Sequence, residues 1–432
     1  MIKDMIEKSV HFAKTRPVRV LYGHCLDNRN HPAVRMVHQI AAELSKLGCV
    51  VQVHEPEQAT PAFIVQPSGT GTHRRKKFQS LRDKLWFAKT ILHDRSALMA
   101  DLEAIREFRP DVVIARHDAY RGSLIRAASK MKIPVIVYAD APVAHETRHW
   151  SDLNSPTGRR FHPPFLVEHY EKIHLQMSNA VVTVSEPGRD CLESYGMDCP
   201  LEIIRNGVGA EFLGPPLDKI QQKILREQIG LTTPHVAGFV GTFKPFHGME
   251  MLGSLIRAMK KRSDLSWLLV GDGPCKAALM ESLGEASAQV VDLGSQPSER
   301  LPQLYRLMDI AVAPYPASHQ PFHFCPLKIL EAQASGAVVV ASARGDIPSM
   351  IGYGERGIPV YEEGLDHWVD TMDMLLHNPI CRNVIARSSL DFIQQNCTWA
   401  NSAQALLKLV LGLCDEIREK DETQQLAQDG NR

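Results

Sequence analysis

Short apolar segments alternate with helical patterns along almost the whole chain, and this alternation restricts the possible folds more than any other feature of the sequence. In the first half, the segments that fit buried strands are residues 18–25, 49–55, 111–117, 133–140 and 180–186. Between the first two of them, apolar residues recur at helical spacing over residues 31–48. Strands that are apolar on both faces and alternate with helices are typical of a parallel, doubly wound sheet.

The second half of the chain starts the same pattern again. Its strand candidates are residues 235–243, 265–273, 288–294, 309–315 and 337–342. Residues 209–218 contain Gly-Pro-Pro, which suits a semi-rigid connection between the halves. The pattern predicts an α/β protein with two similar Rossmann-like domains facing across a cleft, and ligands bound beyond the carboxyl ends of the strands.

Composition excludes several classes of protein. The chain has 432 residues, and its 49 Lys and Arg balance 49 Asp and Glu, so it lacks the positive charge of a dedicated nucleic-acid binder. Nine Cys are scattered without CxxC pairs, which favours reduced thiols over a disulfide framework or a zinc site. No run of about 18 apolar residues occurs. We therefore expect a cytoplasmic protein with no nucleic-acid partner.

Two segments depart from the alternation. Residues 69–95 are rich in Lys and Arg, and their apolar residues fall on one face of a helix over 73–95. This basic helix is either an ordinary surface helix or a docking element for an anionic surface, which would place the protein peripherally at the inner membrane face. Residues 145–165 are polar and Pro-rich, so we expect a loop there, near the cleft.

Residues 322–342 contain the most informative motif. Pro326 suits the first turn of a helix, and Gly336 would end that helix before a buried strand. Exposed amides at a helix start attract phosphate, and Lys328 in the first turn is well placed to meet one. Glu331, one turn further on, can accept hydrogen bonds from two ribose hydroxyls. Alone, the segment is equally compatible with a helix whose Lys and Glu are incidental.

Residues 239–252 favour the phosphate interpretation. An apolar strand runs into a glycine-rich, basic loop and then a helix, so the backbone near Gly241 can approach a ligand that Lys244 and His247 reach. Residues 268–274 supply a further strand that ends in a tight glycine turn. A basic loop and an open helix N-terminus on neighbouring strands predict a diphosphate site.

These motifs also occur together in a known family. The strings IIRNGV followed by Phe212, then GTFKPFHG, LLVGDGP, LPQLYRLMDIAVAPY and PLKILEAQASGAVVVAS stand in the order of the family 4 (group 1) glycosyltransferases, which the chain resembles over roughly residues 18–379. The resemblance implies the GT-B fold and a retaining transferase. It further implies a C-terminal domain that binds a nucleotide-sugar donor and an N-terminal domain that binds the acceptor.

The resemblance sets the expected domain limits. The N-terminal domain spans residues 1–213 and the C-terminal domain spans residues 217–389. Helices at about 390–417 are expected to cross back onto the N-terminal domain, and residues 418–432 to form a polar, frayed tail.

The chain departs from the family pattern at several positions. The Glu-x7-Glu pair has His323 at its first position and Glu331 at its second, so only the ribose-binding role carries over. The usual diphosphate-binding Arg and Lys fall on Thr242 and His247, which leaves the two lysines of the motifs above as substitutes. Cys325 stands where Ser commonly caps the helix, and Cys is a weak cap.

The resemblance then assigns the site residues. The expected donor-binding residues are Gly241, Thr242, Lys244, His247, Phe324, Cys325, Pro326, Leu327, Lys328 and Glu331, with catalytic roles for Lys244, Lys328 and His323. Residues 139–146 resemble an Asn-Ala-Pro segment of the same branch and offer Asp140 and Glu146 to the acceptor. His24 lies where a Gly-Gly loop is usual and is a third acceptor candidate. No Asp-x-Asp stands at a strand end, so we expect neither a metal nor another cofactor.

The expected reaction moves a sugar from a nucleotide-sugar to an acceptor hydroxyl with retention of configuration. The acceptor would be a carbohydrate, a lipid-linked molecule or a protein, as in polysaccharide, glycolipid or glycoconjugate synthesis. One alternative is a catalytically degraded GT-B protein that binds nucleotide or serves as a partner subunit. Another is a GT-B enzyme of different chemistry, such as an epimerase or a phosphorylase, although no segment signals the lysine that a phosphorylase needs for pyridoxal phosphate.

Overall fold

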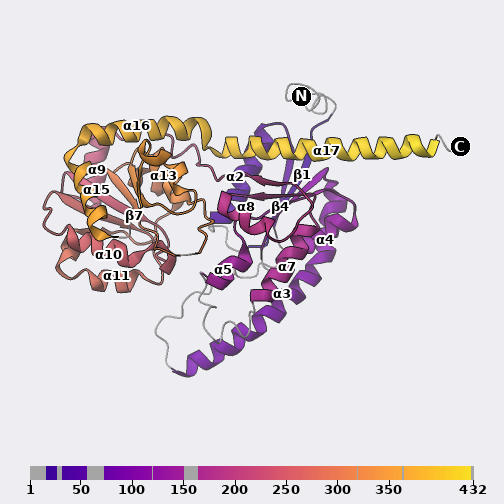
Figure 1. Ribbon diagram of the computed structural model, residues 1–432, viewed down its shortest axis with the longest axis horizontal. Coiled ribbons are helices and arrows are strands. Elements are labelled where there is room, and N and C mark those ends of the chain that lie inside the picture. The colour runs from indigo at the N-terminus through magenta and orange to yellow at the C-terminus, as the bar shows by residue number, and fades with distance from the viewer. Residues whose placement is uncertain are drawn as a thin grey trace. The chain divides into compact units, whose positions relative to one another are not determined.

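The chain forms two compact α/β units. The computed structural model describes residues 16–26, 32–55, 73–118, 120–149, 164–318, 320–361 and 364–429. Unit 1 comprises Met1–Arg205 and Trp399–Arg432, and unit 2 comprises Asn206–Thr398. Each unit has one six-stranded sheet with helices around it (Figure 1). Every strand pairing within the two sheets is parallel, which confirms the predicted fold class.

Unit 1 contains a sheet with the strand order β2-β1-β3-β4-β5-β6. Its strands are β1 (Arg19–Gly23), β2 (Val50–His54), β3 (Val112–Arg116), β4 (Val135–Tyr138), β5 (Ala180–Thr183) and β6 (Leu201–Ile203). Its helices are α2 (Pro32–Lys46), α3 (His73–Phe108), α4 (Ser123–Lys130), α5 (Val143–His149), α7 (Pro164–Gln176), α8 (Glu186–Glu193) and α17 (Trp399–Asp429). The order reverses between β1 and β3, so the loops that follow these strands flank the switch point of the sheet.

Burial explains the strands of unit 1. Every residue of β4 and β5 is buried, as expected for central strands that are covered on both faces. Helix α2 buries one apolar face, including Val37 and Ile40, and it contacts α17. Helix α8 begins where the Ser185 hydroxyl accepts a hydrogen bond of 3.1 Å from the Gly188 amide.

Unit 2 contains a sheet with the strand order β12-β11-β10-β7-β8-β9. Its strands are β7 (His235–Val240), β8 (Leu265–Val270), β9 (Val290–Asp292), β10 (Ile310–Ala313), β11 (Val338–Ser342) and β12 (Ile358–Val360). Its helices include α9 (Lys219–Ile229), η2 (Pro245–His247), α10 (Met249–Ala258), α11 (Lys276–Ser282), α12 (Leu301–Tyr305), α13 (Leu327–Ala334), α15 (Leu365–His377) and α16 (Pro379–Asn396). The order reverses between β7 and β10, as in dinucleotide-binding sheets.

Two strands are absent from the sequence prediction. Each predicted apolar segment contains a strand, but β6 and β12 lie at sheet edges and have three residues each. Strand β12 contains Pro359, which lacks an amide proton and is tolerated on an edge strand. Strand β9 is an edge strand of the same length, but it lies within the predicted apolar segment 288–294.

Helix α3 is longer than predicted. It runs on from the expected end near residue 95 to Phe108. Its later part packs against α4, where the Asp94 carboxylate accepts hydrogen bonds from the Ser123 amide and from Arg126. The side chains of residues 73–90 lie outside the description, so membrane docking through this helix stays a prediction. In the part of the chain described, no helix is long and apolar enough to cross a membrane.

The limits of the units differ from those expected. The chain passes from unit 1 to unit 2 after Arg205 and returns after Thr398, whereas the sequence pattern placed the connection at residues 209–218. Helix α17 continues to Asp429, so the polar residues from 418 on extend this helix. The expected loop at 145–165 begins inside α5, and its residues 150–163 lie outside the description.

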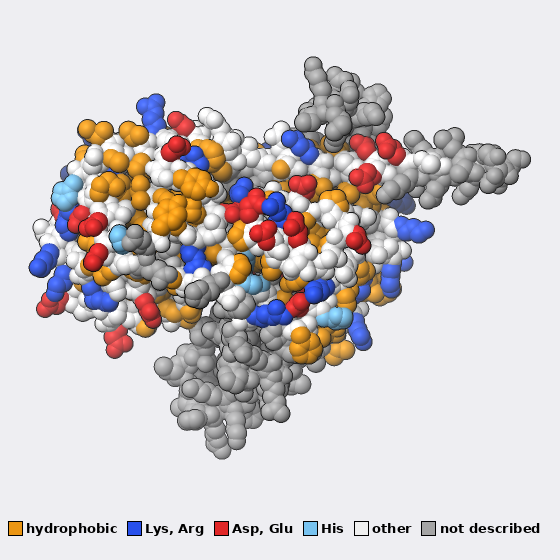
Figure 2. Space-filling model, viewed as in Figure 1, with side chains coloured by type: hydrophobic (Ala, Val, Ile, Leu, Met, Phe, Trp, Pro, Cys, Tyr) orange, Lys and Arg blue, Asp and Glu red, His pale blue; other side chains and the backbone are white. Residues whose placement is uncertain are grey.

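Charges of both signs cover the surface. In Figure 2, basic and acidic side chains are interspersed over the visible face of both units, as the equal numbers of basic and acidic residues suggest. Among the described side chains on this face, neither sign of charge occurs alone.

Gly248 provides a test of the fold of unit 2. Its φ is +70°, and a Cβ there would lie 1.5 Å from the Pro314 carbonyl oxygen. We expect Gly248→Ala to lower the free energy of unfolding by about 3 kcal/mol or more, because left-handed strain adds to a backbone collision. Gly230→Ala is the matched control, since Gly230 has φ +80° with open space around it and should lose only about 1 kcal/mol. Equal losses in thermal or urea unfolding would contradict the close approach.

Candidate functional site

The predicted donor residues follow β7 and β10, the two strands at the switch point of unit 2. Residues 241–248 follow β7, and residues 314–326 lead from β10 to α13. In parallel sheets, the carboxyl ends of such strands form the usual ligand crevice. The topology therefore brings both motifs to one edge of one sheet.

Direct contacts join these two loops. The backbone at Gly248 approaches the Pro314 carbonyl so closely that a side chain has no room. The rings of Phe246 and Phe324 are stacked, with centroids 5.4 Å apart and an interplanar angle of 12°. The loops thus form one surface, held by backbone approach at one point and aromatic stacking at another.

Lys328 is the second residue of α13. Its Nζ atom is buried and has no hydrogen-bond partner among the described residues, although part of the side chain is exposed. The Nζ lies 4.3 Å from the ring centroid of Phe239 and 5.6 Å from that of Tyr315. Burial lowers the pKa of Lys328 to about 7, and the nearby Glu331 opposes this shift.

Gly241 leaves room for this ammonium group. A Cβ at Gly241 would lie 2.7 Å from the Lys328 Nζ. The glycine therefore lets the backbone of the β7 loop and the lysine of α13 share one small space. A ligand that reaches Gly241 is also within reach of Lys328.

His247, one of the predicted donor-binding residues, is buried in the loop after β7. Burial lowers the pKa of His247 far below its ordinary value, and the positive charges of Lys328 and Lys244 add to this effect. Its Nδ1 accepts a 3.4 Å hydrogen bond from the Lys244 amide, which leaves Nε2 as a neutral donor. Lys244 lies beside it at the start of η2, with Nζ 5.5 Å from the Phe246 ring centroid.

The start of α13 leaves backbone amides open. Pro326 occupies the N-cap position, one residue before the helix, and no side chain caps the helix by a hydrogen bond. The first helical residue is Leu327. The Asn206 side chain donates a 2.9 Å hydrogen bond to the Cys325 carbonyl and fixes the turn that leads into the helix. The Ile329 amide donates to the Pro326 carbonyl, at 3.1 Å, and an uncapped helix start of this kind attracts anions.

Glu331 and His323 lie on either side of this helix start. The Tyr305 hydroxyl donates a 3.3 Å hydrogen bond to Oε2 of Glu331 and orients the carboxylate. His323 is 1% exposed, with its ring 4.4 Å from that of Phe324. The exposed Thr242 belongs to the loop after β7.

Phe243 shows that the loop after β7 is held under strain. This buried phenylalanine has φ +41°, which a bulky side chain rarely adopts. A Cβ at Gly273 would lie 1.7 Å from the Thr242 carbonyl oxygen, so the glycine turn after β8 packs directly on this loop. Strained backbone of this kind persists where the surroundings fix it, as they do at many binding sites.

The acceptor candidates lie in unit 1. Asp140 follows β4. Its carboxylate forms an ion pair with the guanidinium of Arg116, the last residue of β3, at 3.0 Å. Burial raises the pKa of Asp140, and Arg116 opposes that shift. Glu146 lies in the first turn of α5, and His24 follows β1. These residues belong to the carboxyl edge of the unit 1 sheet.

Glu171 supports the acceptor segment, and its role is not visible in the sequence. Its carboxylate accepts hydrogen bonds from the amides of Val143 and Ala144, at 2.7 and 3.0 Å, and from the Tyr195 hydroxyl at 2.9 Å. Burial raises its pKa to about 7, against the effect of these bonds. Glu171 thus holds the start of α5, which carries Glu146.

The sequence missed several supporting residues for one reason. Asn206, Tyr305, Arg116 and Glu171 act through tertiary contacts and belong to no chemical motif of their own. Asn206 and Tyr305 had a signal, since they lie in the IIRNGV and LPQLYRLMDIAVAPY strings, whereas Arg116 and Glu171 had none.

Two family descriptions match the chain. Glycosyltransferase Family 4 matches residues 33–212, and Glycosyl transferases group 1 matches residues 234–378. The D-inositol 3-phosphate glycosyltransferases of Corynebacterium aurimucosum and Corynebacterium glutamicum are 28% and 27% identical over 52% and 64% of this chain. These alignments cover 55% and 66% of the relatives, so the chain spans between about half and two thirds of their length.

Solved structures share the fold. Sucrose-phosphate synthase from Thermosynechococcus elongatus aligns with a TM-score of 0.67 at 16% identity, covering 92% of this chain and 99% of that one. HepE from Anabaena, in complex with UDP and glucose, aligns with a TM-score of 0.62 at 15% identity, covering 91% and 99%. The family matches on both units and this likeness in fold show that the chain belongs to the family 4 (group 1) glycosyltransferases of the GT-B fold.

Proposed function

We propose that the chain transfers a sugar from a nucleoside diphosphate sugar to an acceptor hydroxyl with retention of configuration. The observation that carries the proposal is the buried, unpartnered Nζ of Lys328 beside Gly241 and the open start of α13. A buried cation without an anion destabilises the fold, and a bound diphosphate would remove that penalty.

The diphosphate is the leaving group of the proposed reaction. Its negative charge grows as the bond to the sugar breaks, so preorganised donors that face it lower the barrier. Lys328, Lys244 and the first amides of α13 are the donors that this chain offers, and the neutral Nε2 of His247 adds one more. Since these groups supply the charge stabilisation, the proposal assigns no metal ion to the diphosphate.

The other groups of the proposed site bind and orient. Glu331 accepts hydrogen bonds from the ribose, with the Tyr305 hydroxyl keeping the carboxylate in place. Asp140 and Glu146 in unit 1 bind the acceptor. His323 belongs to the loop before α13 and acts near the sugar. The leaving phosphate takes the acceptor proton, so no enzymic nucleophile is required.

The relatives suggest which compounds to test first. HepE was solved with UDP, with UDP-glucose and with UDP and glucose, and this supports uridine diphosphate donors as the first class. The names of the curated relatives support inositol 3-phosphate as one acceptor in a panel that also contains lipid-linked and polysaccharide acceptors.

Binding and transfer assays test the proposal. UDP, GDP, ADP and their sugars are screened by calorimetry with and without Mg²⁺, and each binder is then assayed for sugar release and transfer. Metal-independent binding of one nucleotide, with a product of retained configuration, supports the proposal. Nucleotide binding without release or transfer would favour the degraded relative. No binding to any of these compounds would overturn the proposal and favour a partner subunit.

Lys328→Met separates binding from stability. We expect the affinity of the variant for the nucleotide to fall about 100-fold. Its free energy of unfolding at pH 7 should rise by about 2 kcal/mol, because methionine fills the same space without charge. In the wild type the unfolded lysine protonates below pH 10.5 and the folded one only below about 7, so stability falls as pH drops through this window. The gain from Lys328→Met should therefore disappear above pH 10.5. A less stable variant at pH 7 would contradict the burial argument.

Nucleotide binding should take up a proton. At pH 8 most Lys328 side chains are neutral in the free protein, since their pKa is about 7, whereas a diphosphate favours the ammonium form. Calorimetry at pH 8 in two buffers of different ionisation enthalpy should show uptake of nearly one proton in the wild type and none in Lys328→Met. Equal binding enthalpies in both buffers would exclude Lys328 as the diphosphate ligand.

Glu331→Ala tests the ribose contact. The wild type should bind the ribonucleoside diphosphate about tenfold more tightly than its 2′-deoxy analogue, because a charged acceptor loses one hydrogen bond. In Glu331→Ala the two ligands should bind equally. The control Tyr305→Phe removes only the hydrogen bond to Glu331 and should keep part of the discrimination. Full discrimination in Glu331→Ala would assign the ribose to another residue.

A further inference from the structure

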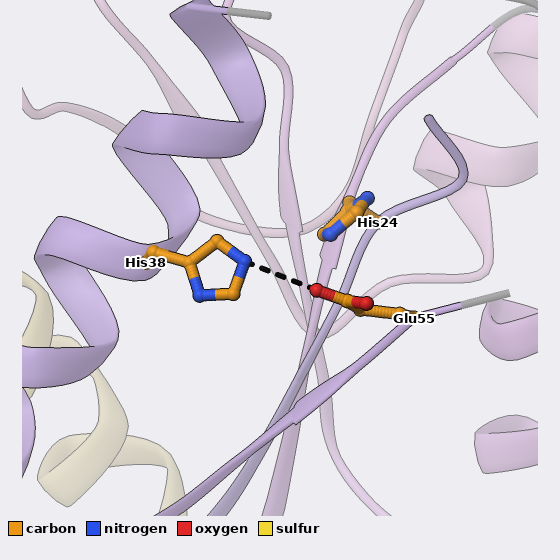
Figure 3. A group of neighbouring side chains, drawn as sticks. All are labelled: His24, His38 and Glu55. Carbon is orange, nitrogen blue, oxygen red and sulfur yellow. Dashed lines mark ion pairs between the residues drawn. The ribbon is translucent and has the colours of Figure 1, made fainter. Parts of the chain in front are cut away.

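A second group of reactive side chains lies in unit 1, apart from the donor residues. His24 follows β1, His38 lies on α2, and Glu55 follows β2. One ligand atom from each residue can be chosen so that all three lie within 4.8 Å of one another. Figure 3 shows the three side chains converging from these elements, with the ion pair drawn between His38 and Glu55.

Strand register places two of these residues side by side. β1 and β2 pair in parallel with Gly23 opposite His54, so the next residues, His24 and Glu55, leave the sheet at the same level. A backbone hydrogen bond of 3.3 Å from the His24 amide to the His54 carbonyl continues this pairing beyond the strands. The constellation is thus fixed by rigid sheet geometry.

Helix α2 supplies the third residue. It connects β1 to β2 and packs its apolar face, which includes Val37, against the unit. His38 follows directly on Val37, with 46% of its side chain exposed, and its Nε2 lies 3.2 Å from Oε1 of Glu55. In a tetrahedral zinc site with bonds of about 2.0–2.1 Å, ligand atoms lie about 3.3 Å apart. His38 and Glu55 already have this separation.

His24 has a nitrogen that the fold leaves unused. The residue is 8% exposed, and its Nε2 is buried without a hydrogen-bond partner in the described part of the chain. Its Nδ1 accepts a long hydrogen bond of 3.3 Å from the Leu26 amide. Coordination of a metal ion through Nε2 would place the imidazole proton on Nδ1, which could then no longer accept the hydrogen bond from the Leu26 amide. A weak hydrogen bond would be exchanged for a coordinate bond.

The described basic groups near His24 are each paired with a carboxylate. Arg116 and His54 are the other basic groups that act on His24 besides His38. The Arg116 guanidinium is paired with Asp140 at 3.0 Å, and the His54 Nε2 lies 2.7 Å from Oδ1 of Asp101. Arg116 and His54 thus each have a carboxylate of their own, and Glu55 pairs with His38.

We propose that His24, His38 and Glu55 bind one Zn²⁺ ion. Two imidazoles and one carboxylate match the three-ligand zinc sites that keep a fourth position for water or a substrate oxygen. Nitrogen-rich sets favour Zn²⁺ over Mg²⁺ or Ca²⁺, which prefer oxygen ligands only. The exposed side of His38 and Glu55 is the path by which the ion enters. His24 is then a metal ligand. An acceptor bound at this place would contact the ion and not the imidazole of His24.

The proposal is compatible with the sequence pattern that argued against a metal. That expectation rested on missing CxxC and Asp-x-Asp motifs. A site assembled from three elements at positions 24, 38 and 55 needs neither motif. It is also independent of the diphosphate chemistry proposed for unit 2, because all three ligands belong to unit 1.

Metal titration of the whole chain tests the proposal. The protein is stripped with a chelator and titrated with Zn²⁺ by calorimetry, and with Co²⁺ while visible absorption is recorded. Four-coordinate Co²⁺ gives strong bands that the hydrated ion lacks, so the spectrum reports the site directly. We expect one equivalent of Zn²⁺ to bind, the Co²⁺ bands to appear, and Zn²⁺ to raise the unfolding temperature.

Variants distinguish this site from adventitious binding at other histidines. His38→Ala and Glu55→Gln alter partly exposed side chains, so both should unfold like the wild type without metal. Each should lower the affinity for Zn²⁺ at least tenfold and abolish the Co²⁺ bands. His169→Ala removes an exposed histidine of α7 and should change nothing. The proposal is overturned if the wild type binds no Zn²⁺, or if both ligand variants bind it as tightly as the wild type does.

Discussion

A buried lysine Nζ without a hydrogen-bond acceptor among the described residues is the central constraint of unit 2. The Lys328 Nζ lies against the faces of Phe239 and Tyr315, which attract a cation, but it has no hydrogen-bond acceptor among the described residues. Aromatic faces compensate only part of the loss of hydration. The fold retains this unfavourable group at the start of α13, next to open amides and beside a glycine whose missing Cβ leaves space for it. Such an arrangement is expected where a ligand, and not the protein, supplies the negative charge.

The charge of Lys328 also affects the protonation of the neighbouring His247. With Lys328 and Lys244 close by, a protonated His247 would add a third positive charge to a buried loop, and its pKa falls accordingly. His247 is thus a neutral donor beside the lysine of α13. The strained φ of Phe243 and the close backbone contacts at Gly248 and Gly273 fix the loop that faces the lysine. In the proposed reaction, preorganised donors of this kind would stabilise the developing charge without reorganising.

The sequence predicted the elements well and the supporting contacts poorly, for physical reasons. Central strands are apolar on both faces, so their segments are recognisable, and the carboxyl ends of parallel strands meet at one edge, so the donor motifs could be placed together. The three-residue edge strands β6 and β12 carry no such pattern. Hydrogen bonds from Asn206 to Cys325 and from Tyr305 to Glu331 join residues 119 and 26 positions apart, and no local periodicity encodes them. Glu171 would be read as one polar residue of an ordinary helix, whereas the fold buries it under the start of α5.

Unit 1 applies the same topological rule to different chemistry. Its sheet order reverses between β1 and β3, and His24 follows the first of these strands just as Gly241 follows β7 in unit 2. In unit 2 the switch point gathers backbone amides and lysines, which suit an anion. In unit 1 the neighbouring edge gathers imidazoles and a carboxylate, which suit a cation with an open coordination position. The fold fixes only where the strand ends lie, so the residues at those ends decide what each edge can bind. The edge of unit 2 carries positive groups that suit an anion, and the edge of unit 1 carries a carboxylate and imidazoles that suit a cation.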